Sequence, residues 1–166
     1  MPDRHTYSLY VNSRRPDATA SVSVKAAAER VYELVSDPGA LAGLASEYSG
    51  HRWLGGASRA AVGARFRGTN RRGVRRWSTV SKVTDASAGS CFAFDVSAYG
   101  IPVARWQYDI EPGADGCVVT ESTWDRRPGW FRSPSSLFTG VWQRAQENQA
   151  NIEATLARLK AAAEGS

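Results

Sequence analysis

Residues 133–163, SPSSLFTGVWQRAQENQANIEATLARLKAAA, decide the fold, because they form the one long stretch of this chain that predicts a helix. Apolar and small side chains recur there at steps of three or four residues, which places them on one helical face. That face consists of Val141, Ala145, Asn148, Ile152, Leu156 and Leu159. The charged residues fall mainly on the other face: Arg144, Glu147, Glu153 and Lys160. Pro134 suits a first helical turn, so we predict a single amphipathic helix over 133–163.

Most of the sequence between Ser58 and Asp125 predicts strands instead, since apolar and polar residues alternate between short turns. The predicted strands are 19–24, 51–54, 64–70, 75–83, 90–98, 103–111 and 117–125, and the predicted short helices are 25–36 and 40–45. Strands joined by short turns form an antiparallel meander, which the C-terminal helix is long enough to cover. The expected fold class is therefore α+β, with a curved antiparallel sheet of about seven strands around a long C-terminal helix.

The length of 166 residues suits one domain, expected at 19–166 after a flexible arm at 1–18 with a short edge strand over 6–11. The net charge is +5, and arginine supplies most of the positive charge, a composition typical of a GC-rich bacterial genome. The sequence contains no apolar run of about 20 residues and no secretory signal pattern, so we expect a cytoplasmic protein with no membrane insertion.

Cys91 and Cys117 form no metal-binding pattern, and each begins a predicted strand on either side of a third. Strands two positions apart lie about 9–10 Å from each other, which exceeds the roughly 7 Å that a disulfide tolerates. We therefore predict two free thiols. The sequence also has no GxSxG, HExxH, P-loop or GxGxxG motif, so hydrolase, metalloprotease and nucleotide-dependent functions lose support, and we expect no cofactor and no metal.

One face of the predicted sheet is lined with aromatic side chains and a few polar groups. A solid core more often uses Leu, Ile and Val, whereas aromatic walls with scattered polar groups are typical of ligand pockets. Asn148 adds an amide to the apolar face of the helix. The predicted ligand-binding residues are Phe66, Asn70, Trp77, Thr79, Phe92, Phe94, Trp106, Tyr108, Asn148 and Ile152, with Ser81 on the same face. The alternative is that the aromatic residues simply pack against the helix.

Three residues are candidates for acid–base chemistry: Glu47, Glu121 and Tyr108. A carboxyl group in an apolar cavity has a raised pKa and can hold a proton near neutral pH. Alternation along the last strand leaves open whether Glu121 or Trp124 faces the sheet's concave side. In the alternative interpretation, Glu121 is solvated on the convex face, and Glu47 pairs with an arginine in a loop.

Six arginines cluster on one predicted hairpin: Arg65, Arg67, Arg71, Arg72, Arg75 and Arg76. No exposed aromatic residues interleave with them as single-stranded nucleic acid would require, so a solvated face is favoured and nucleic-acid binding is not expected. His51 is expected at the surface rather than as a catalytic base. The loop 126–132, RRPGWFR, either covers the cavity or anchors the chain.

The chain resembles the START-like helix-grip superfamily, and within it the polyketide cyclase/dehydrase and lipid-transport branch. The similar stretches are SVSVKAAAERVYELVSDPGAL (21–41), RWLGG (52–56), VGARFRGTNRRGVRRW (62–77), PVARWQYDIEP (102–112), VTESTWDRRPGW (119–130) and the C-terminal helix. The resemblance spans about 19–163 and implies a cavity between sheet and helix. It is specific for the fold and weak for activity, because such proteins include aromatase/cyclases, lipid carriers and chaperone cofactors. RWLGG comes after Ser46-Glu47-Tyr48, whereas similar proteins have a Ser-Pro-Glu-like stretch there. The resemblance makes Glu47 a candidate for the matching carboxylate, but Tyr48 replaces the proline, so we expect the mouth of the pocket near the second helix to differ.

We therefore expect a monomer or homodimer that binds a hydrophobic, aromatic or polyketide-like small molecule. It would act as a cofactor-free cyclase, aromatase or dehydratase. The alternatives are a non-catalytic carrier or sensor of lipid-like ligands, and an interaction protein whose cavity is incidental.

Overall fold

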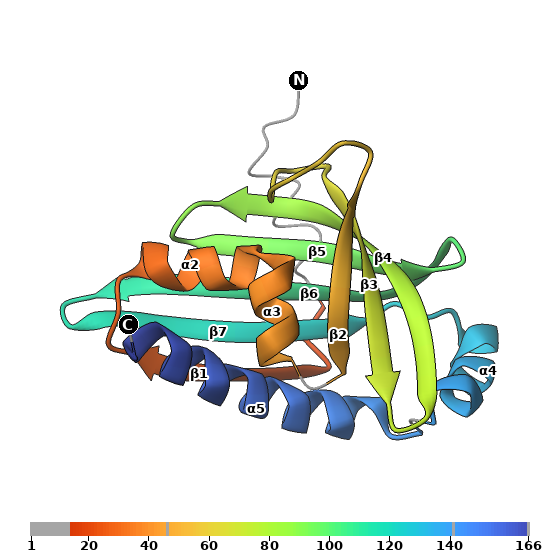
Figure 1. Ribbon diagram of the computed structural model, residues 1–166. Coiled ribbons are helices and arrows are strands. Elements are labelled where there is room, and N and C mark those ends of the chain that lie inside the picture. Colours follow the sequence, from red (N-terminus) through yellow and green to blue (C-terminus); the bar gives the residue numbers. More distant parts are fainter. Residues whose placement is uncertain (1–13, 46, 141, 166) are drawn as a thin grey trace.

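The computed structural model describes residues 14–45, 47–140 and 142–165, and within them seven strands form one antiparallel sheet (Figure 1). The strand order across the sheet is β1-β7-β6-β5-β4-β3-β2. The strands are β1 (Ala18–Val24), β2 (Tyr48–Leu54), β3 (Arg65–Arg72), β4 (Arg75–Ser87), β5 (Cys91–Ala98), β6 (Ile101–Gly113) and β7 (Gly116–Asp125). Each predicted strand is present, and most extend further than expected, because hydrogen-bonded pairing continues to the turns.

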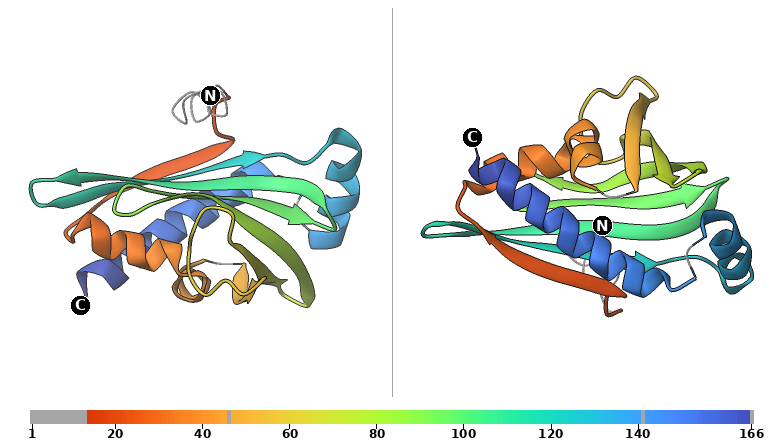
Figure 2. Two further views of the ribbon diagram at one scale, coloured as in Figure 1. Left: turned by 90° about the horizontal axis from the view of Figure 1, so that it is seen from above. Right: turned by 60° about the horizontal axis from the view of Figure 1, so that its bottom comes forward.

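Helices cover one face of this sheet, which curves around them (Figure 2). They are α2 (Ala28–Ser36), α3 (Pro38–Leu44), α4 (Gly129–Thr139) and α5 (Arg144–Glu164). α5 packs against β1 and β7, while α2 lies against β5 and β6 and α3 against β2. This arrangement confirms the predicted α+β helix-grip fold.

The two short helices are held by small apolar faces. In α2, Ala28, Val31 and Val35 recur at helical spacing and are buried. α3 begins with Pro38 directly after Asp37, whose carboxylate accepts a hydrogen bond from the Gly39 amide at 2.8 Å. An aspartate N-cap followed by proline is a strong helix start, so the local sequence explains where α3 begins.

The predicted single helix over 133–163 is wrong, because the structure has two helices there. α4 ends at Thr139 and is capped by Gly140, which adopts a left-handed φ of 74° and donates its amide hydrogen bond to the Ser136 carbonyl. α5 then starts at Arg144. The predicted loop 126–132 is correspondingly helical from Gly129, and Pro134 lies inside α4 rather than at the start of a long helix. A glycine in the left-handed conformation is a common helix terminator, which is the physical reason for the break.

The buried core lies between the sheet and the helices α2, α3 and α5. On α5 the buried face includes Asn148, Ile152, Leu156 and Leu159, as predicted, but Ala145 is exposed because it lies in the first turn of the shortened helix. Val141, also predicted on that face, and the predicted edge strand 6–11 fall outside the described residues.

Cys91 and Cys117 are both free thiols, as predicted, and they lie on β5 and β7 with β6 between them. None of the helices in the described part of the chain combines the length and the apolar character that crossing a membrane requires.

Candidate functional site

A pocket of about 480 Å³ lies between the concave face of the sheet and the helices α4 and α5. Its walls are mainly aromatic and aliphatic. The side chains from the sheet include Phe66, Trp77, Phe94, Val96, Val103, Trp106 and Tyr108. Helix α4 contributes Phe131 and α5 contributes Asn148, Asn151 and Thr155, while Leu41 comes from α3. The volume falls in the range of about 300–1,000 Å³ that is usual for small-molecule sites.

The register between β6 and β7 distinguishes two ends of the pocket. Tyr108 on β6 lies opposite Glu121 on β7, whereas Ala104, four residues earlier on β6, lies opposite Asp125. Four residues of strand span about 13 Å, so these two rows define an inner and an outer end. Tyr99, in the β5–β6 turn, lines the outer end while remaining 91% exposed, so the pocket opens to solvent there.

The inner end holds a buried pair of titratable groups. The Tyr108 hydroxyl donates a hydrogen bond to Glu121 Oε1 at 2.8 Å, and both side chains are only 2% exposed. Burial raises the pKa of Glu121 to about 8, and the hydrogen bond from Tyr108 opposes this shift only in part. Burial, reinforced by the adjacent Glu121, also raises the pKa of Tyr108 well above its ordinary value. At neutral pH this carboxyl group can therefore hold a proton.

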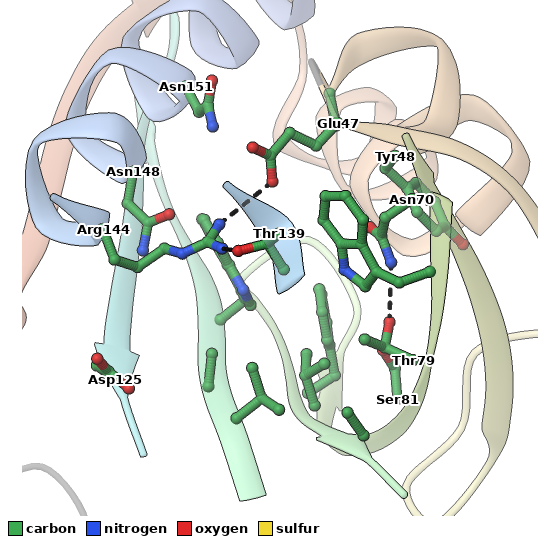
Figure 3. Close-up of a pocket in the computed structure, with 18 of the residues that line it drawn as sticks. Glu47, Tyr48, Asn70, Thr79, Ser81, Asp125, Thr139, Arg144, Asn148 and Asn151 are labelled. Atoms are coloured by element: carbon green, nitrogen blue, oxygen red, sulfur yellow. Dashed lines mark hydrogen bonds and ion pairs between the residues drawn. The ribbon is translucent and has the colours of Figure 1, made fainter. Parts of the chain in front are cut away.

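The side walls carry a few neutral polar groups. The amide of Asn70 donates to the Thr79 hydroxyl at 3.2 Å (Figure 3). Asn148 is 7% exposed and lines the pocket. Tyr48 packs its ring so closely on Gly68 that an added Cβ would lie 2.6 Å from Tyr48 Cε2. Glycine at position 68 therefore makes room for this aromatic wall.

The outer end is ionic. Arg144, at the start of α5, donates to the Thr139 hydroxyl at 2.8 Å and pairs with Glu47 at 3.4 Å (Figure 3). Arg72 from the β3–β4 hairpin pairs with the same Glu47 at 3.7 Å and with Glu147 on α5 at 2.9 Å. These ion pairs join three segments that are far apart in the sequence.

A second ion pair borders the same end. Arg127 donates two side-chain hydrogen bonds to Asp125, from Nε to Oδ1 at 3.0 Å and from Nη2 to Oδ2 at 2.7 Å. It also donates a hydrogen bond to the Ser135 hydroxyl on α4. Burial alone would raise the pKa of Asp125, but the hydrogen bonds and charge of Arg127 lower it below its ordinary value. Arg127 therefore fixes the link between β7 and α4, where the pocket wall passes from sheet to helix.

The structure brings most of the predicted site residues onto this one pocket. Those that line it are Glu47, Phe66, Asn70, Trp77, Thr79, Ser81, Phe94, Trp106, Tyr108, Glu121 and Asn148. Two predicted ligand-binding residues lie elsewhere. Phe92 packs edge-on against Tyr32 of α2 at 6.5 Å between ring centroids, and Ile152 is fully buried in the core. Both are buried where α2 and α5 cover the sheet, and neither lines this pocket.

The structure shows which face of β7 points into the pocket. Glu121 faces the pocket, and Trp124 faces the other way, where its indole N–H donates to the Arg14 carbonyl at 2.7 Å. Glu47 lines the pocket and pairs with arginines at the same time, so the two interpretations of this residue are compatible.

Sequence reasoning missed the ionic outer end. Arg144 was expected on the solvent face of a long helix, yet it lines the pocket because α5 begins at this residue. Asp125, Arg127 and Asn151 were not considered as site residues. The Asp-Arg-Arg sequence at the end of the last strand was the available signal, because Asp125 and Arg127 are near enough in sequence to form a local ion pair.

The predicted basic hairpin is mostly solvated. Arg65, Arg67, Arg71, Arg75 and Arg76 are exposed, and only Arg72 turns toward the pocket's outer end. In the segment 126–132, Phe131 lines the pocket whereas Trp130 is 68% exposed. Within the described residues, no group of three or more His, Cys, Asp or Glu side chains could hold a metal ion.

The chain is similar to one protein family and to several solved structures. A family profile described as polyketide cyclase / dehydrase and lipid transport matches residues 15–164. No protein with a curated function matches the sequence. Among solved structures, the Polyketide_cyc-like protein Cgl2372 from Corynebacterium glutamicum is 28% identical and aligns over 86% of this chain and 87% of its own, with a TM-score of 0.57.

Two more distant structures share the fold. The di-domain ARO/CYC protein StfQ from the steffimycin biosynthetic pathway is 13% identical, with a TM-score of 0.68 over 89% of this chain, which spans half of StfQ. Protein CV1439 from Chromobacterium violaceum is 15% identical, with a TM-score of 0.65 over 88% of this chain and 96% of its own. At these identities the likeness concerns the fold alone.

Proposed function

Because the chain belongs to the polyketide cyclase/dehydrase and lipid transport family, we propose that its pocket binds a hydrophobic, aromatic or polyketide-like small molecule. The observation that carries the proposal is a pocket of about 480 Å³ with aromatic walls and a buried acid at its inner end. Trp77, Phe94 and Trp106 offer flat surfaces for stacking against rings, and Asn70 and Asn148 offer amides for oxygen atoms.

A cofactor-free cyclase, aromatase or dehydratase is the activity that this site supports best. Aldol cyclisation and loss of water need a folded substrate, a group that removes a proton and a group that donates one. Glu121 is the proposed proton carrier at the inner end, with Tyr108 holding its carboxyl group in place. Glu47 is the proposed second carboxylate, paired at the outer end with Arg144 and Arg72.

The proposal predicts that Trp106→Ala weakens ligand binding while Trp142→Ala does not. Trp106 lines the pocket, whereas Trp142 is 68% exposed and lies outside it. Loss of a stacked indole should weaken binding at least about tenfold, equivalent to about 1.4 kcal/mol. Native mass spectrometry of the purified protein would first identify a co-purified molecule, or thermal-shift screening of tricyclic and tetracyclic aromatic compounds would supply a ligand. Equal affinities of the two variants would contradict the proposal.

The same family description includes lipid transport, so a carrier is the second candidate function. The two functions differ in the fate of the ligand. An enzyme converts an added linear polyketone to a product of the same mass by cyclisation, or to one lighter by a molecule of water after dehydration. A carrier releases its ligand unchanged, which liquid chromatography with mass spectrometry distinguishes directly.

A further inference from the structure

One oxygen of the buried Glu121 carboxyl group has no hydrogen-bond partner among the described residues. Oε1 accepts the hydrogen bond from Tyr108, whereas Oε2 is buried and no described donor or acceptor lies within reach. Burying a polar atom without a hydrogen-bond partner destabilises the folded state, so such an atom in a pocket wall indicates that another molecule completes its hydrogen bonding. Glu121 lines the pocket at its inner end, so a ligand bound in the pocket lies beside this carboxyl group.

The surroundings determine what kind of partner Oε2 accepts. Of the elements around Glu121, β6 brings the titratable group Tyr108, β1 brings Ala20 in the opposite register position, and α5 brings Asn151 and Thr155 to the pocket. These side chains supply no cation to balance a carboxylate. Burial without a counter-charge favours the neutral acid, and because Tyr108 donates to Oε1, the acid proton resides on Oε2.

We propose that Glu121 acts as a neutral hydrogen-bond donor and selects ligands that present a carbonyl oxygen at the inner end of the pocket. A protonated Oε2 needs an acceptor, and a ketone or quinone oxygen on an apolar skeleton provides one without bringing charge into the cavity. The inference rests on the proposed function and narrows its ligand class to apolar carbonyl compounds. Hydrocarbon chains and rings without such an oxygen leave the donor unsatisfied.

The test uses two rigid probes that differ only at one carbon, 9-fluorenone and fluorene. Dissociation constants are measured by equilibrium dialysis against the full-length protein at pH 6 and pH 9.5, on either side of the Glu121 pKa of about 8. At pH 6 we expect fluorenone to bind about five- to tenfold more tightly than fluorene, as one hydrogen bond allows. At pH 9.5 the preference should disappear, because an ionised carboxylate faces the carbonyl oxygen with another acceptor.

Two substitutions test whether Glu121 causes the preference for fluorenone over fluorene. Glu121→Gln keeps an oxygen for Tyr108 and an N–H donor for the ligand, so the preference for fluorenone should persist at both pH values. Glu121→Met removes the donor at similar volume and should abolish the preference at both. Because every other titrating group is retained in Glu121→Gln, this variant also controls for unrelated effects of pH, and circular dichroism verifies that both variants are folded.

The outcomes separate the two proposals. If wild-type protein binds both probes equally at pH 6, or if Glu121→Met keeps the preference, the carbonyl inference is overturned while the proposed apolar ligand site stands. If neither probe binds, the proposed function fails, and the inference fails with it.

Discussion

At the scale of single residues, Glu121 shows what alternation in a strand can and cannot predict. The sequence identified this glutamate as a candidate acid, but apolar and polar residues occur on both faces of β7, so its direction stayed open. A contact with a residue distant in sequence determines the direction of Glu121. Trp124, on the opposite face of β7, donates a hydrogen bond to the backbone carbonyl of Arg14. Pairing of Tyr108 with Glu121 likewise depends on the register of β6 against β7, which no local pattern specifies.

The buried acid should make the stability of the protein depend on pH. Burial raises the pKa of Glu121 from 4.5 to about 8, so the folded state binds this proton more tightly than the unfolded state. The stabilising effect is therefore complete below about pH 4.5 and is lost as pH rises through about 8, by an amount of the order of 3–5 kcal/mol at most. Urea unfolding at pH 5, 7 and 9 should show this decline in wild type.

Glu121→Gln is the matched variant for that measurement, since a neutral amide keeps the shape and the hydrogen bond from Tyr108. Its unfolding free energy should change less between pH 5 and pH 9 than that of wild type, so the difference between the two proteins favours the variant increasingly at high pH. Parallel curves for both proteins would show that Glu121 titrates as an ordinary exposed carboxyl group.

At the scale of elements, sequence patterns located the strands well and failed at one helix. Period-two alternation located the strands, most clearly β1 and β3, in which the more buried and the more exposed residues alternate. In β7 buried residues occur on both faces, so alternation located the strand but not its direction. The break between α4 and α5 was missed because helical spacing continues across Gly140, and only its left-handed backbone ends the helix. Backbone geometry of this kind leaves a weak signal, a lone glycine, which a periodicity count overlooks.

The β6–β7 hairpin offers an element-scale prediction that depends on a single glycine. Gly116 has a φ of 138°, and a Cβ there would lie 2.0 Å from the carbonyl oxygen of Val24, which is rigid backbone at the end of β1. Gly116→Ala should therefore destabilise the protein by about 2 kcal/mol or more, since strand β1 must move away from the hairpin. Thermal unfolding followed by circular dichroism would measure the loss.

Gly113, on the other side of the same turn, is the control. Its added Cβ would meet nothing nearer than 3.7 Å, so Gly113→Ala should change the unfolding free energy by less than about 1 kcal/mol. If the two alanine variants were equally stable, the close approach of Val24 to the hairpin would not constrain the fold.

At the scale of the whole molecule, the pocket is completed by contacts that no segment encodes alone. The aromatic wall was predictable, because its residues share one face of neighbouring strands. The ionic outer end was not, because Arg144 and Glu47 are 97 positions apart and meet only when α5 crosses the sheet. Phe92 was predicted to line the pocket because it lies on the same face of the sheet as the aromatic wall. It does not line the pocket, because α2 covers the sheet at that position.

These ion pairs should stabilise the assembled molecule. Arg144→Met removes the closer partner of Glu47, whose side chain is 20% exposed, and leaves the carboxylate with Arg72 alone. We expect a loss of about 1–2 kcal/mol at low ionic strength that diminishes in concentrated salt. Urea unfolding at two salt concentrations checks it, with Arg76→Met, an exposed position on the β3–β4 hairpin, expected to have little effect.

The register of Tyr108 against Glu121 also limits how such a protein can diversify over evolution. Deleting one residue of β7 before Glu121 would turn the acid to the convex face and bring Ser122 into the pocket, and inserting one would bring Thr120 there, so length changes in this strand destroy the site. The β5–β6 turn and the segment around α4 border the outer end and lie outside the ladder. We expect descendants of this chain to acquire new ligands by changing length in those two segments, while the inner end changes only by substitution.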